Sequence, residues 1–204
     1  STPKPSSAAS DVYKRQGLPL GLAVADIHLH DTYYVIGHFH FVVAPGTLMA
    51  LFAGIYHWYP KVTGKRMSDV LGRLHFWPTL VFMFGTFMPM FVLGMAGVSR
   101  RLYDGGASYA HAQDVLWVNQ FITYSSWGLA VSQLFFIINF FVSLKTGKKV
   151  GDNPWEATSL EWATSSPPLG HGNFKSPVKV YRGPYEYSVP GAEKDFSPQH
   201  IEKD

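Results

Sequence analysis

Three long runs without Asp, Glu, Lys or Arg limit what this chain can fold into. They occupy residues 32–60, 74–99 and 115–144. Each run exceeds the roughly 20 residues that a helix needs to cross the hydrocarbon core of a bilayer. Since lipid offers the backbone no hydrogen-bond partner, a helix is the form in which such a run can span. We predict an all-α membrane protein with three transmembrane helices. Helices buried in a soluble core are the alternative, but these are rarely so long and uncharged.

Composition supports the membrane prediction. Charged residues make up 15% of the chain, below the roughly 25% usual for soluble domains. Aromatic rings cluster near the ends of the runs, where the headgroup layer favours them: Tyr33, Tyr34, Trp58, Tyr59, Trp77 and Trp117. The absence of cysteine excludes disulfides, iron–sulfur clusters and thiolate zinc sites. A net charge of +3, placed beside the runs, favours membrane topology over nucleic-acid binding.

The remaining segments differ in character. Residues 17–31 connect into the first run, residues 61–73 and 100–114 are short loops, and residues 145–204 form an irregular, polar, Pro-rich tail. Residues 1–16 are polar and Ser-rich without the apolar core of a signal peptide. We interpret them as a leader foreign to the rest of the chain.

Basic residues predict the orientation, because cytoplasmic loops carry more Lys and Arg. The 61–73 loop and the start of the tail are rich in these residues: Lys61, Lys65, Arg66, Arg73, Lys145, Lys148 and Lys149. In the 100–114 loop, Arg100 and Arg101 are balanced by Asp104 and Asp114. We predict that the 61–73 loop and the tail face the cytoplasm, while residues 17–31 and 100–114 meet on the outer face.

Two histidines lie inside the first run, His38 and His40. In a helix their spacing turns the imidazoles about 200° apart, so they cannot hold one ion together. Ionisable groups inside a membrane are costly and usually mark a site. Neutral imidazole is a common axial ligand of haem iron. We therefore predict one metallocentre on each side of this helix; hydrogen bonding to a neighbouring helix is the alternative.

A second cluster is expected on the outer face. Asp31 precedes His38 by seven residues, about 10 Å of helix rise, which matches the reach from a haem iron to its propionates. Arg100 and Arg101 could pair with those carboxylates, or anchor in the headgroup layer, and Asp31 could cap the helix instead. His30 beside Asp31 could hold Mg²⁺, which usually keeps few protein ligands, or be solvated.

Other polar residues inside or beside the runs have plainer interpretations. His57, His75 and His111 are interpreted as interfacial or packing residues, and His28 has no assigned role. The third run contains several polar side chains, including Asn119, Gln120, Thr123, Ser125, Ser126, Ser132, Gln133 and Asn139. They could line a proton path, but packing between helices is the favoured interpretation. Gly85 and Gly94 predict close helix contacts.

Five motifs together resemble subunit I of the haem–copper respiratory oxidases, in particular those that use cytochrome c. They are residues 30–34 (HDTYY), 37–41 (GHFHF), 94–101 (GMAGVSRR), 153–163 (NPWEATSLEWA) and 166–168 (SPP). The resemblance covers residues 17–173. It implies that the three spans are the last three of a twelve-helix bundle, a fragment of the whole subunit. The tail motif is typical of bacterial members, which implies a bacterial plasma membrane, with the inner mitochondrial membrane as the alternative.

The resemblance also implies roles for matching residues. His38 would ligate the high-spin haem, where oxygen is reduced beside copper, and His40 the low-spin haem. His30 and Asp31 would bind magnesium, and Arg100 and Arg101 would pair with haem propionates. The haems would be of the a type. Partners would include cytochrome c and a subunit II that carries the electron-entry copper.

The implied reaction is reduction of O2 to water coupled to proton translocation. The copper ligands, three histidines of preceding helices, and a second histidine for the low-spin haem have no counterpart in this chain. We therefore expect the fragment alone to be inactive. A quinol oxidase of the same superfamily is one alternative, and a non-catalytic three-helix membrane module is another. Nitric oxide reductase is disfavoured by the tail motif.

Overall fold

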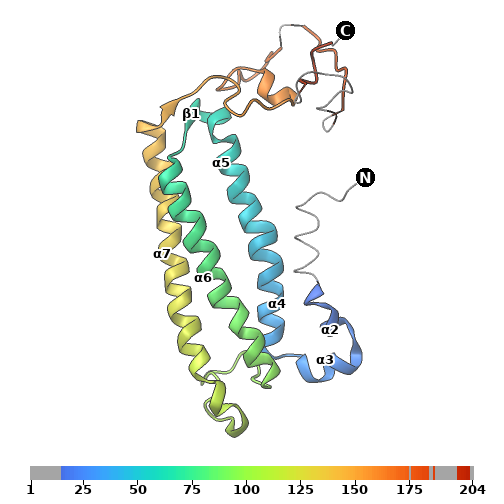
Figure 1. Cartoon of the computed structure of the whole chain (residues 1–204), viewed down its shortest axis with the longest axis vertical. Coiled ribbons are helices and arrows are strands. Elements are labelled where there is room, and N and C mark those ends of the chain that lie inside the picture. The colour runs from blue at the N-terminus through green and yellow to red at the C-terminus, as the bar shows by residue number, and fades with distance from the viewer. Residues whose placement is uncertain (1–14, 175, 184–185, 187–196, 203–204) are drawn as a thin grey trace. The chain divides into compact units, whose positions relative to one another are not determined.

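A computed structural model describes residues 15–174, 176–183, 186 and 197–202 (Figure 1). Most of the leader predicted at residues 1–16 therefore lies outside the described residues. The chain forms two compact units, which are considered separately. The first unit comprises Ser1–Ala53 and Val70–Ile137, and the second comprises Gly54–Asp69 and Ile138–Asp204.

Helices dominate the described residues. Two short helices, α2 (Leu18–Gly21) and α3 (Ala23–Leu29), precede α4 (Tyr33–Val43), a π-helical turn η1 (Ala44–Leu48) and α5 (Met49–Thr63). Then follow β1 (Lys65–Arg66), α6 (Asp69–Met95), the 3-10 turn η2 (Ala110–Val115), α7 (Trp117–Thr146), β2 (Lys148–Lys149) and the 3-10 turn η3 (Leu160–Ala163). Three helical stretches are long and apolar enough to cross a membrane: Tyr33–Thr63, Asp69–Met95 and Trp117–Thr146. The predicted fold class is thereby confirmed.

The first span is continuous from α4 through η1 to α5, although it contains Pro45. Proline has no backbone N–H and its ring crowds the preceding turn, so it removes one hydrogen bond of the regular helix. A wider π-helical turn at Ala44–Leu48 accommodates it. The span begins at Thr32, whose Oγ1 accepts a hydrogen bond from the backbone N–H of Tyr34 at 3.2 Å. Thr32 is therefore the N-cap, and Asp31 is not.

Within the first unit, α4 and α6 lie side by side because glycines allow a close approach (Figure 1). A Cβ on Gly37 would lie 3.2 Å from the carbonyl oxygen of Phe87. A Cβ on Gly94 would overlap the backbone of Tyr34. Small residues serve this purpose in membranes, where apolar lipid provides little force to press helices together. The close contact predicted from Gly94 is present.

Helices α6 and α7 are joined within the same unit by a buried polar network. The hydroxyls of Thr79 and Ser132 lie 2.9 Å apart, and Gln133 Nε2 donates to Thr79 Oγ1 at 3.0 Å. His75 Nε2 lies 3.2 Å from Gln133 Oε1, which can only accept. These contacts support the packing interpretation for Ser132, Gln133 and His75. Side-chain hydrogen bonds of this kind hold helices together in lipid.

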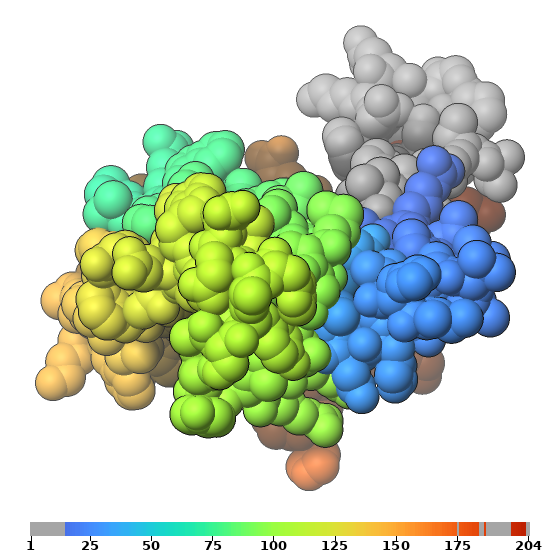
Figure 2. Space-filling model, turned by 90° about the horizontal axis from the view of Figure 1, so that it is seen from below, coloured from blue at the N-terminus to red at the C-terminus, as the bar shows by residue number. Residues whose placement is uncertain are grey.

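The segment after α6 folds back onto the helix ends of the first unit. Leu93, Val98, Ala112 and Val118 form a fully buried cluster, with Tyr33 and other partly buried side chains packed against it. Seen from below, this segment lies against the residues around the start of α4 (Figure 2). The cluster fixes the loop that carries Arg100.

The second unit holds the start of the tail against the end of α5. Lys61 is only 6% exposed, and its ammonium donates to tail carbonyls of Asp152 (3.2 Å), Thr164 (2.7 Å) and Ser165 (3.4 Å). Trp162 is buried, and Lys61 Nζ lies 5.2 Å from its ring centroid. A lysine at the beginning of the predicted 61–73 loop thus serves as a buried anchor for the tail.

Candidate functional site

His38 and His40 lie on α4, one on each flank of the face that packs against α6. That face is marked by Tyr34, whose ring meets Phe91 at 4.7 Å, and by Gly37. With about 100° of rotation per residue, His38 lies to one side of this face and His40 to the other. Two imidazoles that diverge from one helix cannot share one ion, but each is placed to meet a separate group.

The ring of His40 is held in place from two directions. Its Nδ1 lies 2.9 Å from the carbonyl oxygen of Ile36, one turn earlier. A carbonyl can only accept, so Nδ1 carries the proton of this hydrogen bond and Nε2 points away from it. The ring also stacks on Phe87 of α6, with centroids 4.5 Å apart and planes 12° from parallel. This arrangement, with one ring nitrogen fixed to a carbonyl, is usual for metal-ligating histidines.

His38 presents a different environment. Its Nδ1 is buried and has no hydrogen-bond partner among the residues that the structure describes. A buried polar nitrogen without a partner costs about 1–3 kcal/mol, and such groups are rare in folded proteins. His38 is therefore a strong candidate to meet a group from outside the described chain.

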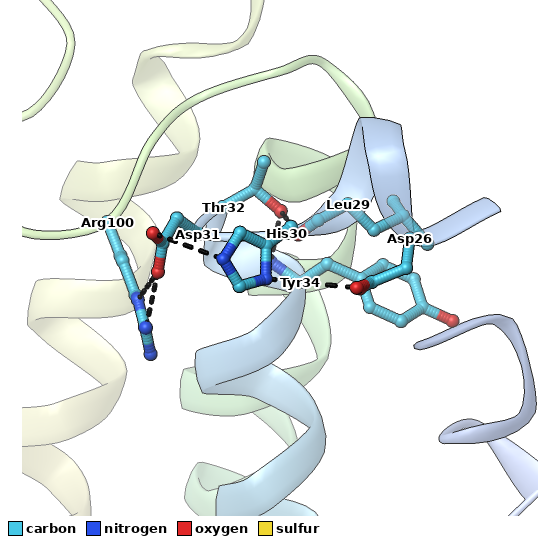
Figure 3. A network of polar contacts seen from close by, with 7 residues as sticks. All are labelled: Asp26, Leu29, His30, Asp31, Thr32, Tyr34 and Arg100. Atoms are coloured by element: carbon cyan, nitrogen blue, oxygen red, sulfur yellow. Dashed lines mark hydrogen bonds and ion pairs between the residues drawn. The ribbon is translucent and has the colours of Figure 1, made fainter. Parts of the chain in front are cut away.

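The cluster that the sequence predicts for the outer face centres on Asp31, which lies between α3 and α4 (Figure 3). Arg100 Nε donates to Asp31 Oδ1 at 2.7 Å, and its Nη2 also contacts that oxygen. The backbone completes the contact, since Arg100 N–H donates to the carbonyl of Asp31 at 2.8 Å. The predicted topology placed Asp31 and Arg100 only on the same face of the membrane. The structure shows that they are in direct contact.

Electrostatics at Asp31 follow from this pairing. The hydrogen bond from Arg100 is the largest cause that lowers the pKa of the Asp31 carboxyl below its ordinary value of 3.8. Positive charge on Arg100, His30 and Arg101 acts in the same direction, while partial desolvation opposes it. The carboxylate is therefore ionised at physiological pH. It is available to a cation or to a hydrogen-bond donor on its exposed side.

His30 lies between two carboxylates. Its Nε2 is 3.5 Å from Asp31 Oδ2, and its Nδ1 is 3.8 Å from Asp26 Oδ2 (Figure 3). Within the described residues, no group of three or more His, Cys, Asp or Glu side chains is arranged to hold a metal ion. His30 and Asp31 are nevertheless adjacent, and a Mg²⁺ site commonly uses one or two protein ligands with several waters.

Arg101 differs from its neighbour Arg100. Its backbone has a φ of +66°, in the left-handed region, and its side chain is exposed. Arg100 is bound to Asp31, whereas the side chain of Arg101 is exposed. Pairing of either arginine with a propionate stays a prediction.

Three contributors to the site were not predicted from the sequence. Asp26 of α3 lies four residues before His30, and side chains at this interval are neighbours on a helix. Predicting a helix over residues 23–29 would therefore have placed Asp26 beside His30. The carbonyl of Ile36 lies at the same interval before His40. Phe87 lies on another span, and no local pattern connects it with His40.

Comparison with known proteins identifies the family of this chain. The family model described as "Cytochrome C and Quinol oxidase polypeptide I" matches residues 15–131. The alternative cytochrome c oxidase subunit 1 of Bradyrhizobium diazoefficiens is 44% identical over 185 residues, which are 90% of this chain and 31% of that protein. The cytochrome c oxidase subunit 1 of Thermostichus vulcanus is 44% identical over 188 residues, 92% of this chain and 33% of that protein.

A more distant relative shows the same pattern of coverage. The cytochrome c oxidase subunit 1 of Corynebacterium diphtheriae is 41% identical over 166 residues, 80% of this chain and 28% of that protein. The chain spans about a third of the length of the curated relatives it matches. The resemblance stated from the motifs is confirmed, and the chain belongs to the cytochrome c and quinol oxidase polypeptide I family.

Proposed function

We propose that this chain is part of the catalytic subunit of a terminal respiratory oxidase. The complete subunit would reduce O2 to water with electrons from cytochrome c and couple this reaction to proton translocation. Its partners would be the other oxidase subunits, notably a subunit II with the electron-entry copper. Three membrane-spanning helices and bacterial relatives named as cytochrome c oxidase subunit 1 support this proposal. The location would be a bacterial plasma membrane.

The pair His38 and His40 carries the proposal. His38 would be the axial ligand of the high-spin haem, and His40 an axial ligand of the low-spin haem. When bound, the haem irons supply electron transfer and oxygen chemistry that protein side chains cannot perform. The protein would hold each iron in a fixed position and keep the two centres separate.

The donor chemistry fits haem. Both ligands are imidazoles, the usual axial donors of haem iron. His40 has its proton fixed on Nδ1 by the Ile36 carbonyl, which leaves Nε2 able to bind a metal. His38 has a buried nitrogen without a partner among the described residues. Stacking on Phe87 restricts rotation of the His40 ring, so a bound iron would meet a preoriented ligand.

The outer-face cluster would bind the polar edge of the cofactors. Arg100 and Arg101 would pair with haem propionates, with Asp31 in the same network. A guanidinium suits this role because its planar fork matches a carboxylate. Asp31 already holds Arg100 in place. His30 and Asp31 would ligate magnesium together with water.

The copper of the oxygen-reducing site would take its ligands from other parts of the complete subunit. The described residues contain no group of three or more His, Cys, Asp or Glu side chains that could hold a metal ion. In this proposal the chain would supply the haem ligands His38 and His40 and the magnesium ligands His30 and Asp31, and other parts of the subunit would supply the copper ligands.

Optical spectra of the complete subunit test this assignment. His38→Leu should remove the high-spin haem band and His40→Leu the low-spin band, each with the other band retained. His28→Leu is the matched control, since His28 is exposed and precedes the span. Unchanged spectra in both variants would refute the proposal and favour a non-catalytic three-helix module.

A quinol oxidase is the second candidate, because the matching family description includes both donor types. The two can be distinguished by oxygen uptake in membranes that contain the complete enzyme. Uptake driven by reduced cytochrome c supports the first proposal. Uptake driven only by a quinol would replace it with the second.

A further inference from the structure

Gln199 is buried in the second unit, where it joins two separate segments of the tail. The residue is only 8% exposed. Its backbone N–H donates to the carbonyl of Thr158 at 3.0 Å, and its carbonyl accepts the N–H of Tyr181 at 2.9 Å. Its side-chain Oε1 accepts the N–H of Leu160 at 3.3 Å, and Nε2 donates to the carbonyl of Arg182 at 3.1 Å. Gln199 thus bonds to both segments through its backbone and through its side chain.

The residues around Gln199 take part in the same contact. Arg182 Nη1 donates to the carbonyls of Pro198 and Ile201, each at 2.7 Å. The side chains of Tyr181 and Glu202 are joined by a further hydrogen bond. Residues 197–202, which we call the strap, are therefore bound to the rest of the tail by a set of polar contacts.

The side chain of Gln199 caps the 3-10 turn η3, which begins at Leu160. The N–H groups at the start of a helix have no acceptor within the helix and need one from elsewhere. Ser159 holds the N-cap position, but its side chain makes no capping hydrogen bond. Gln199 Oε1 supplies the acceptor from 39 residues further along the chain. This cap is present only while the strap is docked.

The turn η3 carries the groups that surround Lys61. Trp162 lies within η3, is 1% exposed, and has its ring centroid 5.2 Å from Lys61 Nζ. The carbonyls of Thr164 and Ser165, which accept from Lys61 at 2.7 and 3.4 Å, follow η3 directly. A buried ammonium is costly without such acceptors, so the state of Lys61 depends on the position of η3.

The strap can open without unfolding the spans. Its docking relies on hydrogen bonds, each of which makes a small net contribution in water. The apolar side chains beside these contacts are about half exposed, Val180 by 50% and Ile201 by 48%. Segments with few buried apolar contacts open locally at low cost in free energy.

We propose that the strap is a latch: Gln199 caps η3 when the strap is docked, and η3 in turn holds Lys61 at the end of α5. When the strap opens, η3 loses its cap and the contacts of Lys61 with the tail loosen. Gln199 is thus a positioning residue that acts on Lys61 through η3. The latch lies within the second unit and is independent of His38 and His40.

Hydrogen–deuterium exchange of the full chain in detergent tests the latch. Gln199→Met keeps the length of the side chain and the backbone bonds but removes both side-chain hydrogen bonds. Loss of one such bond should speed exchange of the Leu160 amide by about five-fold. Exchange should also quicken at the amides of Trp162 and Ser166, which donate to the Ser159 carbonyl and the Asp152 carboxylate.

Gln113→Met is the matched control, because Gln113 Nε2 also donates to carbonyls but lies in the first unit. It should leave exchange at Leu160, Trp162 and Ser166 unchanged. A change at Leu160 alone in Gln199→Met would overturn the link to η3 and Lys61. If that variant does not fold, a Leu160 amide that exchanges at the unprotected rate in the wild type still refutes the docked strap.

A double variant tests whether Gln199 and Lys61 act on one closed state. Limited proteolysis within residues 152–166 should be faster in Gln199→Met and in Lys61→Met than in the wild type. Because each change opens the same contact, the double variant should be cut no faster than the faster single variant. Additive effects of the two changes on the free energy of opening would overturn the latch.

Discussion

The carboxylate of Asp31 and the guanidinium of Arg100 are joined across 69 residues of sequence. Arg100 Nε donates to Asp31 Oδ1 at 2.7 Å, and the Arg100 backbone N–H donates to the Asp31 carbonyl at 2.8 Å. Asp31 has a φ of +56°, in the left-handed region. The link between the start of α4 and the segment after α6 is therefore fixed through both backbone and side chain.

Acidification should weaken this link. Arg100 lowers the pKa of the Asp31 carboxyl below 3.8. A carboxyl with a lowered folded-state pKa stabilises the fold fully above its unfolded pKa, and this contribution is lost as pH falls through the folded value. We expect the thermal midpoint of the wild type to fall more steeply than that of Asp31→Asn below about pH 4.

The control for this experiment is Asp114→Asn, which removes an exposed carboxylate of the same unit. It should retain the wild-type pH dependence. If Asp31→Asn also retains it, the ion pair does not contribute to stability.

Gly94 should tolerate substitution less well than Gly37. An added Cβ at Gly94 would overlap the Tyr34 backbone, whereas at Gly37 it would make tight contacts of 3.2–3.3 Å. Overpacking typically lowers the free energy of unfolding by about 1–3 kcal/mol. Because the backbone of Tyr34 cannot move aside as a side chain can, we expect the Gly94 variant to lie at the upper end of that range. In detergent, the thermal unfolding midpoint of Gly94→Ala should be lower than that of Gly37→Ala.

Gly46→Ala is the matched control, because a Cβ at Gly46 would meet nothing within 4 Å. It should unfold close to the wild-type temperature. A destabilisation equal to that of Gly94→Ala would contradict the close approach of α4 and α6.

Phe87→Ala should loosen the ring of His40, the proposed ligand of the low-spin haem, without removing it. Stacked aromatic pairs contribute about 0.5–1.5 kcal/mol beyond their buried area, and Phe87 stacks on the His40 ring. In the complete subunit we expect a broadened electron paramagnetic resonance signal from the low-spin haem. Phe84→Ala, which removes a ring that contacts Phe41 at 5.2 Å, should leave that signal sharp.

Lys61→Met should release the tail from α5. The variant keeps the length of the side chain but leaves the carbonyls of Asp152, Thr164 and Ser165 without their donor. Hydrogen bonds to charged groups contribute about 1.5–3 kcal/mol each. Limited proteolysis should cut within residues 152–166 faster than in the wild type, while Lys179→Met should not change the rate.

Residues 17–204 expressed alone should bind no stoichiometric copper and consume no oxygen. The described residues provide no group of three metal ligands, and the proposed copper ligands belong to the rest of the subunit. Metal analysis and an oxygen electrode check this outcome. Oxygen uptake by the isolated chain would overturn the assignment.

Much of the fold and part of the site could be read from sequence because they depend on local rules. A charge-free run of sufficient length becomes a helix in lipid, where the backbone must bond to itself. The divergence of His38 and His40 follows from helical rotation alone. The motifs around them gave the family, which the comparisons confirm.

The partners of these residues could not be read in the same way. Phe87 is brought to His40 by the approach of α6, which depends on glycines of both helices. Lys61 appears in the sequence as a loop cation, yet tail carbonyls from residues 152–165 surround it. The side chain of a basic residue beside a span can be solvated or can donate hydrogen bonds to nearby carbonyls. For Lys61 the outcome depends on the path of the tail, which the sequence does not show.

The sequence by itself determined the three spans, the spacing of two imidazoles and the family, since each depends on neighbours along the chain. The tertiary structure decided that Thr32 caps α4 while Asp31 binds Arg100, and that Arg101 stays exposed. Those outcomes depend on contacts between distant segments, whose geometry is set by packing of the whole unit.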